Sequence, residues 1–282
     1  MFADLTDVRC YYEVLGSGDP LLLIPGLGTT CALWDSVAIE LANSFSVIVL
    51  DNRGIGQSIP KRSPKTLEDF STDLVELMDH LQVARAHVLG LSLGGMIAYQ
   101  VASDHPSRVD RLVLVSCTHR FSPYLREMAR LLGHALRYFP QDVFQRTVKL
   151  LGTSPEYLDA HVDDIERKIA TARESTAPRS SVGKQLWCLA RHDRDNGWGN
   201  PVAAPTLVIA GEQDHLIPAC YARRMAQQIR GSEFMVVPEC GHNPFDEKPD
   251  VVIPRITEFL MRGRGDDSRH IQALPRAMET PV

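Results

Sequence analysis

The chain of 282 residues has no closely spaced pair of cysteines. A zinc site or a compact disulfide framework needs spacings such as Cys-x-x-Cys, and no His-Glu-x-x-His motif is present either. We therefore predict no metal site and expect most of the cysteines to be buried thiols. The six cysteines are Cys10, Cys31, Cys117, Cys188, Cys220 and Cys240.

The sequence also lacks long apolar runs and an excess of basic residues. Its apolar runs, such as Leu21–Ile24, are far shorter than the roughly 20 residues that cross a bilayer. The acidic N-terminal segment has no apolar core of a signal peptide. A formal net charge of -5 gives no positive field for nucleic acid. We expect a cytoplasmic protein whose partner is a small, largely apolar molecule, whereas the oligomeric state stays open.

Short apolar stretches typical of strands alternate with helical patterns along the chain. The predicted strands are Cys10–Leu15, Leu21–Ile24, Ser46–Leu50, His87–Leu89, Arg111–Ser116, Thr206–Ala210 and Glu233–Val237. The predicted helices between them are Ala32–Ala42, Leu67–Leu81, Leu93–Ser103, Tyr221–Ile229 and Val251–Met261. Continuously apolar strands alternating with helices indicate an α/β fold, with a mostly parallel sheet covered on both faces.

The alternation stops after Ser116. From about residue 119 to 200 no strand is predicted, and helical patterns follow one another at Tyr124–Arg137, Pro140–Leu151 and Pro155–Ala172. A block of this length is too long for a loop. We expect a core formed by residues 1–118 and 201–262, a helical lid over residues 119–200, and a flexible tail at residues 263–282.

Ser92 lies between a predicted strand and a predicted helix. It is the central residue of the Gly-x-Ser-x-Gly motif that runs from Gly90 to Gly94. This strand-to-helix context is the sharp turn that presents a nucleophilic serine, and glycine on either side is a steric requirement of so tight a turn. The alternative, a chance match in a loop, is less consistent with the flanking strand and helix.

A nucleophilic serine needs a base, and the base needs a third group to orient it. His242 follows the last predicted strand, at the edge where open α/β sheets place their sites. Asp214 follows the strand Thr206–Ala210 and gives the chain order serine, aspartate, histidine. Glu212, two residues closer to the strand, is the alternative acid. One of the two carboxylates is expected to cap the helix that follows.

An acyl-transfer site also needs two N–H donors for the oxyanion. We predict the backbone amide of Leu93, next after the serine, and that of Leu27, in the turn Pro25-Gly26-Leu27-Gly28. Taken alone, the two glycines of that turn could be simple turn formers.

The loop Asp51–Ser58 contains Gly-x-Gly and invites comparison with nucleotide-binding loops. The third glycine is missing, because Ile59 occupies its position, and no Walker lysine follows. We therefore predict a structural turn with Arg53 in a scaffold ion pair, and no bound cofactor.

Five motifs in this order resemble the α/β-hydrolase superfamily. They are PGLG at 25–28, DNRGIGQS at 51–58, GLSLGG at 90–95, GEQDHLIP at 211–218 and CGHNPFDEKP at 240–249. The resemblance covers roughly residues 10–118 and 201–262, and it is nearest to small-ester, enol-lactone and natural-product-tailoring hydrolases. Serine at the elbow differs from the epoxide hydrolase and haloalkane dehalogenase branches, which carry aspartate there. Pro25 departs from the histidine that many relatives have.

The resemblance implies a serine hydrolase that cleaves a carboxylic ester, lactone or thioester of a small molecule. Ser92 would attack the carbonyl, His242 would transfer the proton, Asp214 would hold the imidazolium, and the amides of Leu27 and Leu93 would bind the oxyanion. The alternative is a non-hydrolytic protein of the same fold, either a ligand receptor or a cofactor-free perhydrolase or tailoring cyclase. Candidate pocket walls in the lid are Phe121, Tyr124, Trp187 and Trp198.

Overall fold

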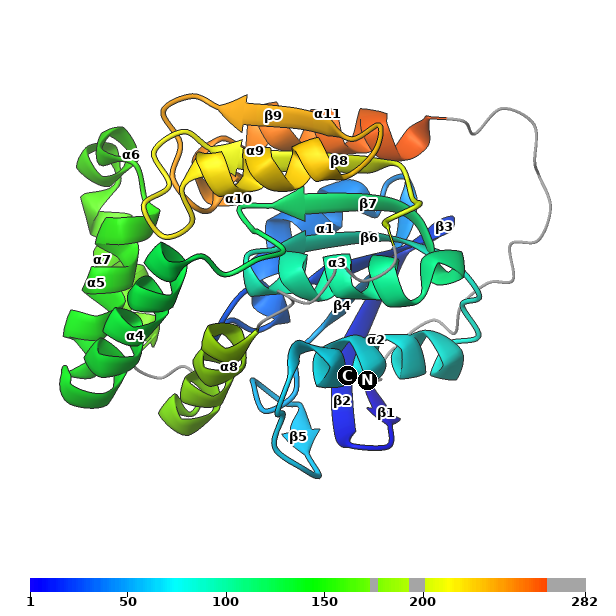
Figure 1. The fold of residues 1–282 in the computed structure, drawn as a ribbon, viewed down its shortest axis with the longest axis horizontal. Helices are drawn as coiled ribbons and strands as arrows, with labels where there is room; N and C mark the ends of the chain where they lie inside the picture. Colours follow the sequence, from blue (N-terminus) through cyan, green and yellow to red (C-terminus); the bar gives the residue numbers. More distant parts are fainter. Residues whose placement is uncertain (173–176, 193–200, 263–282) are drawn as a thin grey trace, which may run out of the picture.

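The computed structural model describes residues 1–172, 177–192 and 201–262. Figure 1 shows a twisted central sheet with helices on both faces. Within these residues the sheet has nine strands. They are β1 (Phe2–Asp4), β2 (Val8–Gly16), β3 (Asp19–Ile24), β4 (Phe45–Leu50), β5 (Ile59–Pro60), β6 (Ala86–Leu91), β7 (Val109–Val115), β8 (Thr206–Gly211) and β9 (Glu233–Val237).

The sheet is mostly parallel. Its order is β1-β2-β4-β3-β6-β7-β8-β9, with β5 paired to β2. Strands β3, β4 and β6 to β9 are parallel to one another, whereas β2 is antiparallel to β4 and to both β1 and β5. The predicted α/β fold is therefore confirmed. The sequence pattern does not predict β1 and β5, two short strands that pair with β2.

Helices cover the sheet because its central strands are apolar on both faces. Leu22 and Ile24 of β3 belong to one core with α2, α3 and α9, whereas Leu21 and Leu23 belong to a second core with α1 and α11. Alternate side chains of a strand point to opposite faces, so each face needs its own helical layer. The helices around the sheet are η1 (Cys31–Trp34), α1 (Asp35–Leu41), α2 (Leu67–His80), α3 (Leu93–Asp104), η2 (Pro106–Arg108), α9 (Ala219–Gln228), α10 (Pro244–Glu247) and α11 (Pro249–Met261).

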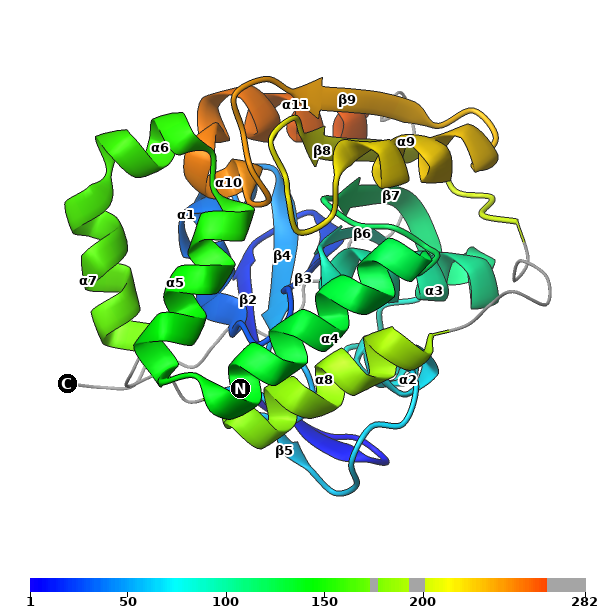
Figure 2. The same cartoon turned by 60° about the vertical axis from the view of Figure 1, so that its left-hand side comes forward.

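Five further helices occur between β7 and β8 in the described part of the chain. They are α4 (Pro123–Tyr138), α5 (Gln141–Gly152), α6 (Pro155–Ala160), α7 (Val162–Ala172) and α8 (Arg179–Arg191), and we call them the helical segment. Figures 1 and 2 show them beyond the carboxyl ends of β6 to β9, with α4 and α8 side by side. Leu132 and Leu136 of α4 and Val182 and Leu186 of α8 form a third apolar core there.

The helical pattern predicted over Pro155–Ala172 forms two helices with a break between them. Helix α6 ends at Ala160 and α7 begins at Val162, because His161 has a non-helical backbone with φ -129 and ψ 28. The His161 ring stacks on Tyr157, and its Nδ1 lies 3.0 Å from the Tyr157 carbonyl oxygen. These local contacts stabilise the break between the two helices.

All six cysteines are free thiols, and all but Cys220 are buried. In the described ranges, no helix has both the length and the apolarity that a membrane crossing requires. The expected tail at residues 263–282 lies outside the described residues.

Candidate active site

Ser92 occupies the sharp turn between β6 and α3. Its backbone has φ 57 and ψ -118, a conformation that costs free energy for a residue with a side chain. The Ser92 N–H donates to the carbonyl oxygen of Val115 at the end of β7 (2.9 Å), which fixes the turn to the neighbouring strand. The surrounding sheet thus stabilises the strained backbone of Ser92. The serine itself lines a cavity and is not part of the apolar core.

Gly90 and Gly94 leave room for this turn. A Cβ atom at Gly94 would lie 2.1 Å from the carbonyl oxygen of Ile24, and one at Gly90 would lie 2.2 Å from that of Gly94. Both positions therefore exclude any side chain. Gly95, which follows Gly94, packs against Cys117. Burial raises the pKa of the Cys117 thiol, so the thiol stays protonated.

Asp214 and His242 meet across two loops. The imidazole Nδ1 of His242 lies 2.7 Å from Oδ2 of Asp214, whose side chain is buried. The other carboxylate oxygen accepts the backbone N–H groups of Leu216 and Ile217, both at 2.9 Å. An ionised carboxylate only accepts hydrogen bonds, so the proton belongs on Nδ1 and Nε2 is left as an acceptor.

Glu212, the alternative acid, points elsewhere. Its side chain is exposed, and Oε2 accepts the backbone N–H of Glu239 at 3.3 Å. The expectation that one of the two carboxylates caps the following helix is wrong, because the N-cap of α9 is Pro218 and it has no side-chain hydrogen bond. Asp214 Oδ1 instead accepts the backbone N–H groups of Leu216 and Ile217 in its own loop, ahead of α9. One carboxylate thus combines the local backbone contact with the contact to His242.

The C-terminus of α5 joins the loops that carry Asp214 and His242. The carbonyl oxygen of Gly152 accepts the backbone N–H of His242 at 2.7 Å, and that of Leu151 accepts the N–H of His215 at 3.2 Å. The last carbonyls of a helix have no partner within the helix, so they are available to neighbouring loops. The end of α5 therefore holds both loops in register.

Glu247 strengthens the same junction. Its buried carboxylate oxygen Oε2 accepts the backbone N–H of Gly241 at 3.0 Å and that of Ser154 at 3.1 Å. Ser154 is the N-cap of α6, and Gly241 precedes His242. Glu247 was not among the site residues predicted from the sequence. The available sequence signal was its place in the CGHNPFDEKP motif, two residues before the end.

The predicted oxyanion donors come from two neighbouring turns. Leu93 is the first residue of α3, where a backbone N–H has no partner within the helix. Leu27 lies in the turn after β3, which is held by the bond from Asn52 Nδ2 to the Pro25 carbonyl oxygen (3.0 Å). Leu27 lines the cavity that contains Ser92, whereas the Leu93 side chain is buried below it.

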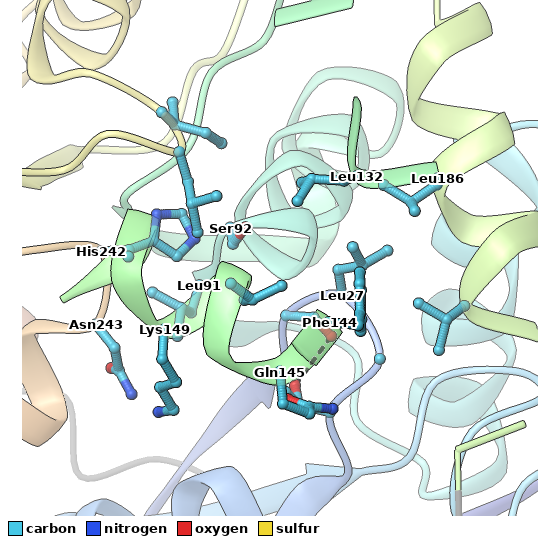
Figure 3. A pocket seen from close by; sticks show the side chains of 18 of the residues that line it. Leu27, Leu91, Ser92, Leu132, Phe144, Gln145, Lys149, Leu186, His242 and Asn243 are labelled. Atoms are coloured by element: carbon cyan, nitrogen blue, oxygen red, sulfur yellow. Dashed lines mark hydrogen bonds between the residues drawn. The ribbon is translucent and has the colours of Figure 1, made fainter. Parts of the chain in front are cut away.

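The cavity has a volume of about 300 Å³ and contains Ser92 and His242 (Figure 3). Most of its wall is apolar, and leucine is the commonest residue in it. Gln145 and Lys149 of α5 and Asn243 form a polar edge (Figure 3). The apolar wall includes Phe121, Leu125, Leu132, Leu136, Phe144, Val182 and Leu186.

The four aromatic residues expected to line the pocket have different positions. Phe121 lines the cavity, but Tyr124 and Trp187 are each 48% exposed and are not in its wall. Tyr124 stacks on Tyr221, and the Trp187 ring lies under the guanidinium of Arg191. Trp198 lies outside the described residues. Leucines at helical spacing in α4, from Leu125 to Leu132 and Leu136, were the sequence signal for the wall.

Arg53, in the loop after β4, forms the expected scaffold ion pair. Arg53 is buried, and its Nε donates to Asp73 of α2 at 2.7 Å while another guanidinium nitrogen donates to the Asp69 carbonyl oxygen at 3.1 Å. For the parts of the chain that the structure describes, no cluster of three or more histidine, cysteine or carboxylate side chains is suited to a metal ion.

One family model matches most of the chain. The family model described as "alpha/beta hydrolase fold" matches residues 19–249. Among curated proteins, RutD of Caulobacter vibrioides, whose name gives carbamate hydrolase as a provisional activity, is 26% identical over 255 residues. The alignment covers 89% of this chain and 94% of RutD.

Solved structures of similar shape include two named hydrolases. A thermophilic esterase from Thermogutta terrifontis has a TM-score of 0.81 and 27% identity, with 92% of this chain and 98% of that chain covered. The enol-lactonase from Burkholderia xenovorans LB400 has a TM-score of 0.79 and 25% identity, with coverage of 93% and 100%.

The packing at Gly94 predicts a large effect of a single methyl group. We expect Gly94→Ala to destabilise the protein by at least about 1–3 kcal/mol, because the new atom meets backbone that cannot move away. Gly133→Ala, in α4 with no atom within 4 Å of the added Cβ, is the control and should be neutral or stabilising by up to about 1 kcal/mol. Urea unfolding of both variants measures the difference, and equal stabilities would contradict the steric argument.

Proposed function

The chain belongs to the α/β-hydrolase fold family, and we propose that it is a serine hydrolase that forms an acyl-enzyme on Ser92. The observation that carries the proposal is the strained serine in a cavity shared with His242, whose imidazole is hydrogen-bonded to the buried carboxylate of Asp214. A protein that only binds a ligand gains nothing from such strain. A nucleophilic serine gains an exposed hydroxyl that the substrate can approach.

The proposed reaction proceeds in two steps. His242 Nε2 takes the proton of the Ser92 hydroxyl as the serine oxygen attacks the substrate carbonyl carbon. The resulting oxyanion accepts hydrogen bonds from the backbone amides of Leu27 and Leu93. Collapse of the tetrahedral intermediate breaks the bond to the leaving alcohol or thiol, which receives the proton from His242. Water then attacks the acyl-enzyme with His242 again as base, and the acid product leaves Ser92 free.

Asp214 keeps His242 in the tautomer that this reaction needs. Its carboxylate accepts a hydrogen bond from the Nδ1–H of His242, so Nε2 carries the lone pair that accepts the serine proton. Two backbone N–H groups hold the other oxygen, so the carboxylate does not rotate away from the ring.

The proposed substrate is a carboxylic ester, lactone or thioester of a small, largely apolar molecule. The apolar wall of the cavity supports this class, since it would bury an acyl chain or ring next to Ser92. The relatives' names, which give carbamate, ester and enol-lactone hydrolysis, all describe attack on a carbonyl carbon. We also propose that the helical segment acts as a lid, because α4, α5 and α8 supply most of the apolar wall.

We expect a fluorophosphonate to label Ser92 and to abolish ester hydrolysis in proportion to labelling. Mass spectrometry of the digested protein should locate the adduct on the peptide that contains Ser92. Ser92→Ala should lose both labelling and hydrolysis while its circular dichroism spectrum is unchanged. Full activity of Ser92→Ala on an ester would rule out the acyl-enzyme and favour proton-transfer chemistry or ligand binding on the same fold.

Asp214→Asn should reduce kcat by a factor on the order of 10⁴, because the neutral amide no longer selects the productive tautomer of His242. Glu212→Gln is the matched control: it changes the neighbouring exposed carboxylate, which accepts the backbone N–H of Glu239 and points away from His242. This variant should leave kcat nearly unchanged. Steady-state kinetics on an activated ester compares them. A larger loss in Glu212→Gln would assign the acid role to Glu212.

Leu132→Phe should shift the preference toward shorter acyl chains, because Leu132 lines the cavity and the larger ring narrows it. The ratio of kcat/KM for a short ester to that for a long one should rise by about tenfold or more. Trp187→Ala, which removes an exposed side chain outside the cavity wall, should leave this ratio unchanged. An equal loss toward both esters in Leu132→Phe would mean that α4 serves only as scaffold.

A further inference from the structure

Gln185 is a buried polar residue of α8 that contacts the turn after β3. Its side chain is 1% exposed, and its Oε1 accepts the backbone N–H of Gly28 at 2.9 Å. Among the described residues, its Nε2 has no hydrogen-bond partner. Burial of an amide side chain costs free energy unless its hydrogen bonds are made. A glutamine that is buried with one hydrogen bond therefore suggests that this bond has a specific role.

The bond to Gly28 fixes one of the two peptide groups that flank Leu27. The Gly28 N–H belongs to the peptide between Leu27 and Gly28, which Gln185 holds. The other peptide joins Gly26 to Leu27 and carries the Leu27 N–H. Its carbonyl oxygen, on Gly26, accepts the side-chain hydroxyl of Thr29 at 3.0 Å. Because a peptide group is planar, a fixed carbonyl also fixes the direction of the N–H on the opposite side.

Helix α8 also restricts the turn sterically. Gly28 has φ 67, and a Cβ built on it would lie 3.1 Å from Cγ2 of Val182, one turn before Gln185 on the same helix. The turn is thus enclosed between α8 and the residues that follow β4, where Asn52 Nδ2 donates to the Pro25 carbonyl oxygen. Among the residues that the structure describes, Gln185 is the one residue of the helical segment that forms a hydrogen bond with the backbone of this turn.

We infer that Gln185 is a positioning residue that orients the Leu27 amide for the oxyanion, so that α8 completes the oxyanion site when it is docked on the core. The inference rests on the proposed serine hydrolase function. It identifies a role for the helical segment beyond covering the cavity, since the same helix that supplies Val182 and Leu186 to the wall holds the turn of the proposed donor.

The test is Gln185→Met, which keeps the length and volume of the side chain but removes the strong acceptor. Removal of an oxyanion donor typically costs about 10²–10³ in kcat, and we expect about 10–100-fold for a donor that is misaligned rather than removed. KM should change by less than about threefold. An alkylboronic acid, which forms a tetrahedral adduct on the serine, should bind more weakly by a factor similar to the loss in kcat.

The boronic acid separates positioning from stability. A purely structural role would lower the active fraction or the Tm but leave the inhibition constant of the boronic acid unchanged, because that constant does not depend on enzyme concentration. Lys184→Met is the control on the same helix: its Nζ donates to Ser63 on the surface at 2.8 Å, and its loss should alter neither kcat nor boronic acid binding. Gln185→Asn, whose amide is one methylene too short to reach Gly28, should act like Gln185→Met and serves if the methionine variant is poorly folded.

The outcomes distinguish this inference from the proposed function. If the parent protein hydrolyses esters and binds the boronic acid but neither Gln185 variant changes the inhibition constant, the positioning role is overturned and the acyl-enzyme proposal stands. If the parent protein neither hydrolyses esters nor binds the boronic acid, the proposed function is overturned and the role of Gln185 with it.

Discussion

The backbone of α3 approaches the end of β3 so closely that no side chain fits between them. A Cβ at Gly94 would lie 2.1 Å from the Ile24 carbonyl oxygen and 2.7 Å from that of Pro25. This contact brings the first turn of α3 against the turn that follows β3. The amides of Leu27 and Leu93 therefore come from two backbone segments in contact, and Ser92 stands between the strand and the helix. The proposed oxyanion site depends on this missing side chain more than on the identity of either leucine.

The helical segment forms hydrogen bonds with the turn of Leu27 and with the loops that carry Asp214 and His242. Gln185 of α8 holds the turn of Leu27, the carbonyl oxygens at the end of α5 hold the loops of Asp214 and His242, and the Ser154 N–H shares the Glu247 carboxylate with Gly241. These contacts use backbone groups that a helix end leaves unpaired or buried polar side chains. A segment that only covered the cavity would need apolar contacts alone. The contacts made here link the geometry of the cavity wall to that of the reacting groups.

The sequence predicted the parts of the fold that have a strong periodic pattern. Strands β3, β4 and β6 are apolar at almost every position because both faces are covered, and α2 and α3 have clear helical spacing, so their positions followed from the sequence. Strands β1 and β5 have three and two residues, too few for a pattern, and they form only by pairing with β2. The break at His161 depends on a ring contact with Tyr157 that no periodicity records. In the helical segment, the aromatic side chains were poor guides to the cavity wall, since Trp187 and Tyr124 are on outward faces and the leucines of α4 face inward.

In the candidate site, too, the sequence indicates which residue types are present but not how they are arranged. The sequence supplies two carboxylates after β8, and their spacing does not decide between them, because a loop can present either. The choice comes from a local turn: Oδ1 of Asp214 binds the N–H groups of Leu216 and Ile217, which leaves Oδ2 directed at His242. A buried carboxylate needs donors to compensate for lost hydration, and two of its three donors are backbone groups of its own loop. The two backbone N–H groups therefore hold the carboxylate in place and replace part of its lost hydration without any contribution from His242. The imidazole then donates to the carboxylate oxygen that is left, Oδ2. The orientation of the proposed base thus follows from how the aspartate satisfies its own hydrogen bonds, a constraint that only the folded loop provides.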